Sequence, residues 1–367
     1  MPESSRVAPS RASQKGVLAA ARKCAGLLGA LGLVLSLVTG ALPSGQAAAA
    51  LSSRAGTGAL SVLVEPSKLG SDAGMQPVYS FVLSAKRSVD MTMYELGDEV
   101  MMSDLVTDKR RGVKVRVILD TNREHSRNLA AFNILRAGGV KVAWAAASYE
   151  ATHQKTITVD GTRSLILTAN LTSEYYTTTR DFGIFDTNPA DVAAIEAVFN
   201  ADFAHVAITP SHGADLVWSP GSEAAMLAVI NGARHTLSIE NEEMGDSAIT
   251  AAIAATAKRG VKVEVTMTAD SSYDSALGEI VHAGGSVHLY ADDSSDLYIH
   301  AKTTIADAGR STERIYVGSI NFSSASMDRN RELGVITTLS TIVDAINAVV
   351  SADFTQCAAA TDCRSYD

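Results

Sequence analysis

His153-Gln154-Lys155-Thr156-Ile157-Thr158-Val159-Asp160 is the stretch that decides the fold, because the chain contains its pattern twice. The second copy reads His300-Ala301-Lys302-Thr303-Thr304-Ile305-Ala306-Asp307. An asparagine and then a carboxylate follow each copy: Asn170 and Asp181 after the first, Asn321 and Glu332 after the second. One H-x-K-x-x-x-x-D is a weak pattern, but two copies with matched partners indicate a duplicated unit.

The duplication extends well beyond these motifs. The segment RRGVKVRVILD at 110–120 returns as KRGVKVEVTMTAD at 258–270, and the Glu-x-Gly-Asp that ends at Asp98 returns at Asp246. The two motif histidines are 147 residues apart, and the two asparagines and the two carboxylates are each 151 apart. We therefore expect halves at 60–205 and 216–355, joined by a linker at 206–215 and followed by a tail at 356–367.

Within the first half, strand-like and helix-like segments alternate. Runs typical of strands lie at 60–65, 89–94, 113–119 and 140–145, and runs typical of helices lie at 99–110, 127–137 and 190–203. Residues 154–159 and 163–168 flank Asp160-Gly161, which predicts a hairpin with a tight turn. This alternation indicates the α/β class. We expect two similar α/β/α-layered halves, packed about a pseudo-twofold axis with one shared active site.

The strand period places the polar motif residues together. Side chains two apart in a strand share a face, so His153 and Lys155 point the same way, as do His300 and Lys302. The same rule pairs Thr168 with Asn170 and Ser319 with Asn321. If the two hairpins face each other, imidazoles, ammonium groups, amides and hydroxyls converge. Such a cluster of donors and cations fits an anionic tetrahedral group, namely phosphate.

These residues resemble the HKD motif of the phospholipase D superfamily. The segments TAN at 168–170 and GSIN at 318–321 are similar to the G-S-x-N element of that family, with Leu167 and Thr168 where the family prefers Gly and Ser. The resemblance covers the chain from about residue 60 to about residue 355. It implies a phosphoric diester hydrolase that works through a phosphohistidine intermediate.

The resemblance also implies a role for each motif residue. His153 is expected to be the nucleophile and His300 the general acid and base, an assignment that the near-symmetric sequence alone leaves open. Asp181 and Glu332 are expected to hold the histidine rings through their second nitrogen atoms. The expected phosphate-binding residues are Lys155, Lys302, Asn170 and Asn321, with Thr168 and Ser319 also contacting substrate.

Four further carboxylates recur in the two halves, and no metal chemistry is expected at the site. Asp160 and Asp307 lie on the opposite strand parity and are expected to fix the hairpins. Glu95 and Glu243 also recur, and either a pocket-lining or a structural role is open for them. No metal or other cofactor is expected, because the motif lysines would repel a cation.

The N-terminal region has the pattern of a signal peptide. Residues 1–23 contain five basic residues and one acid, residues 24–53 are uncharged with an apolar centre at 27–42, and small residues occupy 47–50. We expect a signal peptide at 1–50, a tether at 51–59 and a secreted protein; an uncleaved membrane anchor is the alternative. In an oxidising compartment Cys357 and Cys363 are expected to form a disulfide.

The net charge of the chain without its expected signal peptide indicates which class of substrate it binds. Removal of residues 1–50 takes away five of the 31 basic and one of the 40 acidic residues, which leaves a net charge of −13. That balance is unfavourable for wide contact with nucleic acid. We expect a monomer that acts on phospholipid, with water or an alcohol as acceptor and Tyr149 and Tyr298 at the rim of the site.

Other functions stay open. The first alternative is an exported nuclease of the same superfamily, with Arg123, Arg127 and Arg180 as a local basic path. A non-catalytic phosphate- or lipid-binding protein is disfavoured by the two intact His-Lys pairs. A membrane transferase similar to cardiolipin synthase is disfavoured because no later segment is long and apolar enough to span a bilayer.

Overall fold

A computed structural model describes residues 60–66, 73–293, 296–359 and 363–366 of the chain. The expected signal peptide and tether lie outside these residues. In the described part, no helix combines the length and the hydrophobicity needed to cross a membrane.

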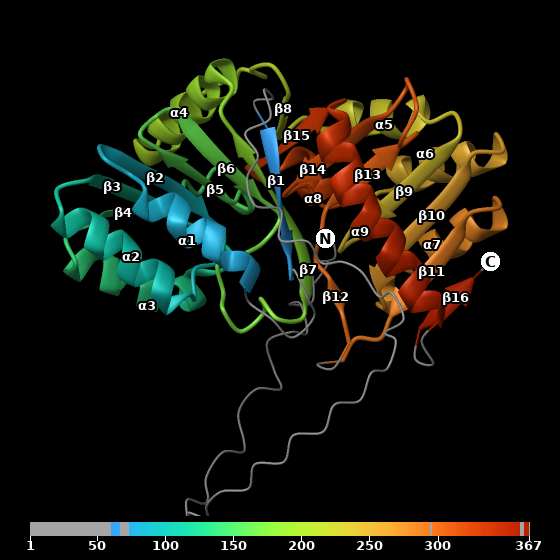
Figure 1. The fold of residues 1–367 in the computed structure, drawn as a ribbon, viewed down its shortest axis with the longest axis horizontal. Coiled ribbons are helices and arrows are strands. Elements are labelled where there is room, and N and C mark those ends of the chain that lie inside the picture. The colour runs from blue at the N-terminus through green and yellow to red at the C-terminus, as the bar shows by residue number, and fades with distance from the viewer. Residues whose placement is uncertain (1–59, 67–72, 294–295, 360–362, 367) are drawn as a thin grey trace, which may run out of the picture. The chain divides into compact units, whose positions relative to one another are not determined.

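The first half is built on a mixed sheet. Its strands are β1 (Leu60–Glu65), β2 (Ser88–Met93), β3 (Lys114–Leu119), β4 (Lys141–Trp144), β5 (Thr156–Val159), β6 (Arg163–Leu167) and β7 (Thr179–Asp186). They run in the order β1-β7-β6-β5-β2-β3-β4 (Figure 1). Strands β2, β3 and β4 are parallel, and every other neighbouring pair in this order is antiparallel.

Helices cover this sheet. They are α1 (Gln76–Leu83) with the short η2 (Ala73–Met75) before it, α2 (Glu99–Arg110), α3 (His125–Ala137) and α4 (Pro189–Phe203). The recurring Glu-x-Gly-Asp has a local explanation, since Asp98 caps α2 by accepting from Val100 N and Met101 N. Asp246 caps the equivalent helix of the second half in the same way.

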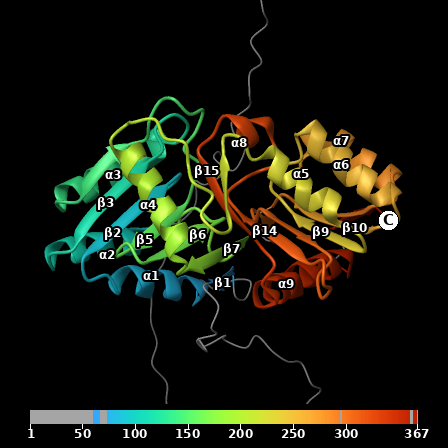
Figure 2. The same cartoon turned by 90° about the horizontal axis from the view of Figure 1, so that it is seen from above.

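The second half repeats the first. Its strands are β8 (Leu216–Ser219), β9 (Thr236–Glu240), β10 (Lys262–Thr268), β11 (Ser286–Tyr290), β13 (Thr303–Ala306), β14 (Arg314–Gly318) and β15 (Glu332–Thr337). Its helical segments are α5 (Glu223–Gly232), α6 (Ser247–Lys258), η3 (Ser271–Tyr273), α7 (Asp274–His282), α8 (Ser324–Asp328) and α9 (Ser340–Ala359). The order β8-β15-β14-β13-β9-β10-β11 matches the first sheet strand for strand, which confirms the expected α/β duplication. In Figure 2, α9 lies on one side of this sheet and α5, α6 and α7 on the other.

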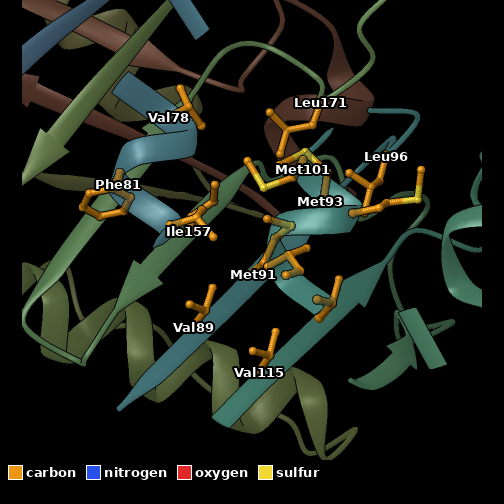
Figure 3. Packing of buried hydrophobic residues seen from close by; sticks show 14 of the residues in the cluster. Val78, Phe81, Val89, Met91, Met93, Leu96, Met101, Val115, Ile157 and Leu171 are labelled. Atoms are coloured by element: carbon orange, nitrogen blue, oxygen red, sulfur yellow. The ribbon is translucent and has the colours of Figure 1, made fainter. Parts of the chain in front are cut away.

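Each half has its own apolar core. In the first half, Met91 and Met93 of β2 pack between α1, α2 and the neighbouring strands, with Leu96 and Leu171 closing one end (Figure 3). A third cluster joins the halves: Phe182 and Ile184 of β7 belong to the same buried group as Ile315 of β14 and Ile346 of α9. Burial of this shared apolar surface holds the two sheets together.

A short segment of each half also forms backbone hydrogen bonds with the other half. The short strand β12 (Tyr298–Ile299), which precedes the second motif, pairs in parallel with Thr179 and Arg180 at the start of β7. In the matching place before the first motif, Thr152 forms a parallel bridge with Arg331. This pairing places each motif histidine next to the carboxylate of the opposite half.

The C-terminal segment is fastened to the second sheet. A disulfide joins Cys357, within α9, to Cys363. Strand β16 (Arg364–Tyr366) then pairs antiparallel with β11 at the sheet edge.

Candidate active site

The motif residues lie just before the hairpins rather than inside them. Strand β5 begins at Thr156, two residues later than the sequence predicts, so His153 and Lys155 occupy the extended segment that enters the strand. His300 and Lys302 lie likewise between β12 and β13. Both lysine side chains are fully buried, and each ammonium donates to the carbonyl of the histidine two residues before it. Each pair is thus locked into one local arrangement.

The histidine rings are held by carboxylates from the opposite halves. His153 Nδ1 lies 2.9 Å from Glu332 Oε2, and His300 Nδ1 lies 2.8 Å from Asp181 Oδ1. This crossed pairing follows from the backbone pairing of β12 with β7 and of Thr152 with Arg331. With Nδ1 engaged by a carboxylate, Nε2 of each ring is the nitrogen that is left for chemistry.

The hydroxyls of Thr168 and Ser319, which the sequence analysis assigned to substrate binding, have another role. Thr168 Oγ1 donates to Asp181 and also accepts from Phe182 N. Ser319 Oγ exchanges hydrogen bonds with the backbone of Leu333. Both residues are fully buried. These hydroxyls position the strands that carry the two carboxylates, and their contact with substrate stays a prediction.

The two asparagines differ in their surroundings. Within the described residues, the buried Oδ1 atoms of Asn170 and Asn321 accept no hydrogen bond. Asn321 Nδ2 lies 3.3 Å from Glu242 Oε2. Amide oxygens at the motif that accept no hydrogen bond within the protein are available to bind a ligand.

Asp160 and Asp307 anchor the hairpins, as the sequence analysis proposed. Both adopt a left-handed backbone, with φ of 57° and 54°. The Asp160 carboxylate accepts hydrogen bonds from the backbone N–H groups of residues 86–88, and Asp307 accepts from those of residues 234–236. Burial opposes ionisation of Asp160, but these hydrogen bonds outweigh it and lower the pKa. Each motif aspartate ties its hairpin turn to the start of the adjacent central strand.

Two buried ion pairs cross between the halves next to the site. Arg180, which precedes Asp181, binds Asp353 of α9 at 2.5 Å. Arg331, which precedes Glu332, lies 2.9 Å from Asp202 of α4. Asp202 and Asp353 are equivalent residues, 151 positions apart, so the same ion pair recurs in both directions and fixes the residues beside both carboxylates.

The arginines expected to form a basic path are neutralised. Arg180 is paired with Asp353, Arg127 lies 2.6 Å from Glu95, and Arg123 contacts Glu150. Each of these guanidinium groups thus has a carboxylate partner, which weakens the basic path, and contact with nucleic acid stays an alternative prediction.

Sequence reasoning missed two residues that line the site. Glu242 Oε2 lies 2.9 Å from Lys302 Nζ and 3.5 Å from His300 Nε2. Tyr94, the equivalent residue of the first half 148 positions earlier, packs its ring edge-on against His153 with 4.5 Å between the centroids. A search for repeated residues passes over both, because the two copies differ at this position.

Burial sets the charge state of the first-half groups. It lowers the pKa of His153, and Lys155 adds to that effect while Glu332 opposes it. Burial, and next the neighbouring Lys302, lowers the pKa of Lys155 to about 7. Burial alone would raise the pKa of Glu332, but the combined interactions with His153, Lys155 and Ser319 lower it. His153 is thereby favoured as a neutral ring beside an ionised partner.

All these groups belong to one site. The Glu242 carboxylate interacts electrostatically with both His300 and His153, and Lys155 with both Asp181 and Glu332. Across the described ranges, no set of three or more His, Cys, Asp or Glu side chains is arranged to bind a metal ion. The arrangement brings the two imidazoles and the two ammonium groups of the motifs into one site.

Comparisons with known proteins agree with this geometry. The family described as "Cardiolipin synthase, PLD-like domain" matches residues 79–203 and 226–354, one match in each half. Among curated proteins, none is significantly similar in sequence.

Solved structures share the duplicated fold. A phosphatidylserine synthase from Haemophilus influenzae is 13% identical with a TM-score of 0.59, over 80% of this chain and 86% of that one. A polyphosphate kinase from Porphyromonas gingivalis is 12% identical with a TM-score of 0.60, over 80% of this chain and 50% of that one. This chain therefore spans half the length of that kinase. The family match in both halves, the duplicated sheets and the paired motifs show that the chain belongs to the phospholipase D superfamily.

Proposed function

We propose that the protein is a secreted phosphodiesterase of the phospholipase D type that acts on phospholipids. The observation that carries this proposal is the crossed arrangement: each histidine Nδ1 is bound to the carboxylate of the other half, at 2.9 Å for His153 and 2.8 Å for His300. Two oriented imidazoles beside buried lysines form a site for nucleophilic displacement at phosphorus.

The reaction follows in two displacements. In the first, the lone pair of His153 Nε2 forms an N–P bond while the bond from phosphorus to the leaving oxygen breaks, and His300 gives its proton to that oxygen. In the second, water or an alcohol attacks phosphorus and transfers its proton to His300. The N–P bond then breaks, and its electron pair returns to His153. Lys155 and Lys302 stabilise the charge on the non-bridging oxygens in both steps.

The charge around the site favours a small head group over a polynucleotide. Glu95, the residue that follows Tyr94, lines a hollow of about 270 Å³ together with Arg127 and Glu174. Arg127 is already bound to Glu95, so this wall carries net negative charge. Nucleic-acid binding depends on free cationic groups along the backbone path. The family match, named for cardiolipin synthase, also supports a lipid substrate.

The proposal is tested by offering several substrates in parallel. The purified protein receives phosphatidylcholine vesicles with ethanol, and in separate reactions single-stranded and double-stranded DNA. Formation of phosphatidylethanol is the expected result, since a covalent intermediate can be intercepted by an alcohol. DNA shortening without phosphatidylethanol would select the nuclease instead.

Histidine variants test the mechanism itself. His153→Ala and His300→Ala are each expected to abolish turnover, while His282→Ala, an exposed histidine on α7, serves as the matched control. EDTA is expected to have no effect. Full activity in either site variant, or EDTA inhibition that a divalent metal reverses, contradicts the mechanism.

A further inference from the structure

Glu242 occupies the place in the second half where a phosphate oxygen is expected. Its Oε2 lies 2.9 Å from Lys302 Nζ, 3.3 Å from Asn321 Nδ2 and 3.5 Å from His300 Nε2. A lysine, an asparagine and a histidine of the motif thus converge on one carboxylate oxygen. These are the donors that the proposed reaction needs for the substrate.

The carboxylate is held there from its other side. Tyr298 of β12 donates its hydroxyl to Glu242 Oε1 at 3.1 Å. Burial alone would raise the pKa of Glu242, but attraction to Lys302 and then to His300 lowers it well below its usual range. Glu242 is therefore an anion at ordinary pH, bound within a set of donors and cations.

In the first half, the position equivalent to Glu242 carries no carboxylate. Tyr94 stands at the equivalent position, and its ring packs against His153 and lies 5.0 Å from Lys155 Nζ. Like Lys302, the Lys155 ammonium donates to the carbonyl of the histidine two residues before it, but within the described residues it forms no ion pair of its own. The two halves are thus unequal as anion sites, because the cation of the second half alone is matched by an internal anion.

We propose that Glu242 is a specificity-determining residue that competes with bound phosphate for Lys302 and Asn321, and so selects singly charged phosphodiesters over doubly charged phosphomonoesters. This inference rests on the proposed phosphodiester chemistry. A diester carries one negative charge and is neutralised by the first-half cation, whereas a dianion also needs the second. Repulsion from a fixed carboxylate grows with ligand charge, so it weighs most against the dianion. The same repulsion promotes release of a phosphomonoester product.

Direct binding measurements test this role without turnover. Titration calorimetry is done at about pH 7 with inorganic phosphate, of which a large share is then a dianion while Lys155 is still partly protonated, and with dimethyl phosphate as the monoanionic diester. We expect Glu242→Gln to bind inorganic phosphate on the order of tenfold more tightly than the unaltered protein, with a clearly smaller gain for dimethyl phosphate. Glu243→Gln, which removes a carboxylate one residue away, is the matched control and is expected to show less than half of that gain on a logarithmic scale.

Three results would overturn the inference. They are an unchanged phosphate affinity in Glu242→Gln, an equal gain in Glu243→Gln, and an equal gain for both ligands. Glu242→Ala provides a second variant if the glutamine variant does not fold, as checked by its thermal unfolding. Absence of phosphodiesterase activity in the unaltered protein would refute the proposed function and leave the binding result intact. An active enzyme with unchanged phosphate affinity in Glu242→Gln would refute only this inference.

Discussion

The crossed pairing of histidines and carboxylates predicts which variants share a kinetic defect. Asp181 belongs to the first half but holds His300, and Glu332 belongs to the second half but holds His153. Asp181→Asn is therefore expected to impair the general acid, and Glu332→Gln the nucleophile. If each carboxylate served the histidine of its own half, the two defects would be exchanged.

The size of the defect follows from the lost contact. Asp181 Oδ1 lies 2.8 Å from His300 Nδ1, and both side chains are about nine-tenths buried. Loss of a charge-assisted hydrogen bond of this kind leaves the ring without its orienting partner. For an alcohol leaving group we expect the first displacement to slow by roughly 10²–10⁴-fold, the usual contribution of a general acid. For an acidic phenol, which leaves without a proton, we expect a loss of about tenfold or less.

The assay compares two leaving groups in the first displacement alone. Rapid mixing with a nitrophenyl phosphodiester gives a burst of phenol whose rate reports that step, and an alkyl diester is followed by single-turnover chemistry. Asp181→Asn is expected to recover strongly with the phenol, and Glu332→Gln is expected to be slow with both substrates. His300→Ala and His153→Ala are the reference variants for the two patterns.

One outcome refutes the crossed arrangement whatever the roles of the histidines. Asp181→Asn must follow the leaving-group pattern of His300→Ala, and Glu332→Gln that of His153→Ala. If Asp181→Asn follows His153→Ala instead, the carboxylate serves its own half and the crossed pairing is not the catalytic one.

Three further predictions follow from groups around the site. Because burial lowers the pKa of Lys155 to about 7, its ammonium loses its proton as pH rises through that value. The affinity for dimethyl phosphate should therefore fall between about pH 6 and about pH 9. Lys155→Met should abolish this pH dependence. Arg331→Ala leaves Asp202 buried and unpaired, and should lower the free energy of unfolding in urea by about 3–5 kcal/mol. The control Arg329→Ala, at an exposed ion pair, should lower it by about 0–1 kcal/mol. Similar losses in the two variants would contradict the structural role of the buried pair. Asp160→Ala should cost about 1–3 kcal/mol of stability through lost hydrogen bonds to backbone N–H groups, with activity per folded molecule retained; lost activity at full stability would make it a catalytic residue instead.

The sequence predicted the duplicated halves because the repeat preserves the residues that build each half. The capping Asp98 and Asp246, and the hairpin aspartates Asp160 and Asp307, recur because their local backbone geometry recurs. Strand and helix positions followed from the same local patterns. The strand that carries Asp181 was not predicted; one of its two neighbours in the sheet, β1, comes from a distant part of the chain.

The sequence did not predict which carboxylate binds each motif histidine. Asp181 follows His153 by 28 residues and Glu332 follows His300 by 32, so proximity along the chain favours the pairing within each half. The observed pairing depends on where β12 and Thr152 add to the opposite half, which is a tertiary property. The neutralisation of Arg127 and Arg180 was hidden for the same reason, because their partners lie 32 and 173 residues away.

The departures from the repeat explain how a symmetric scaffold performs an asymmetric reaction. One imidazole must be neutral to attack phosphorus while the other holds a proton, yet both rings have the same kind of carboxylate on Nδ1 and the same lysine contact. Residues that repeat cannot distinguish the two rings. Tyr94 places an aromatic ring against His153, whereas Glu242 places negative charge 3.5 Å from His300 Nε2. In the proposed mechanism, the position where the two halves differ is therefore the one that favours attack by His153 and proton transfer by His300.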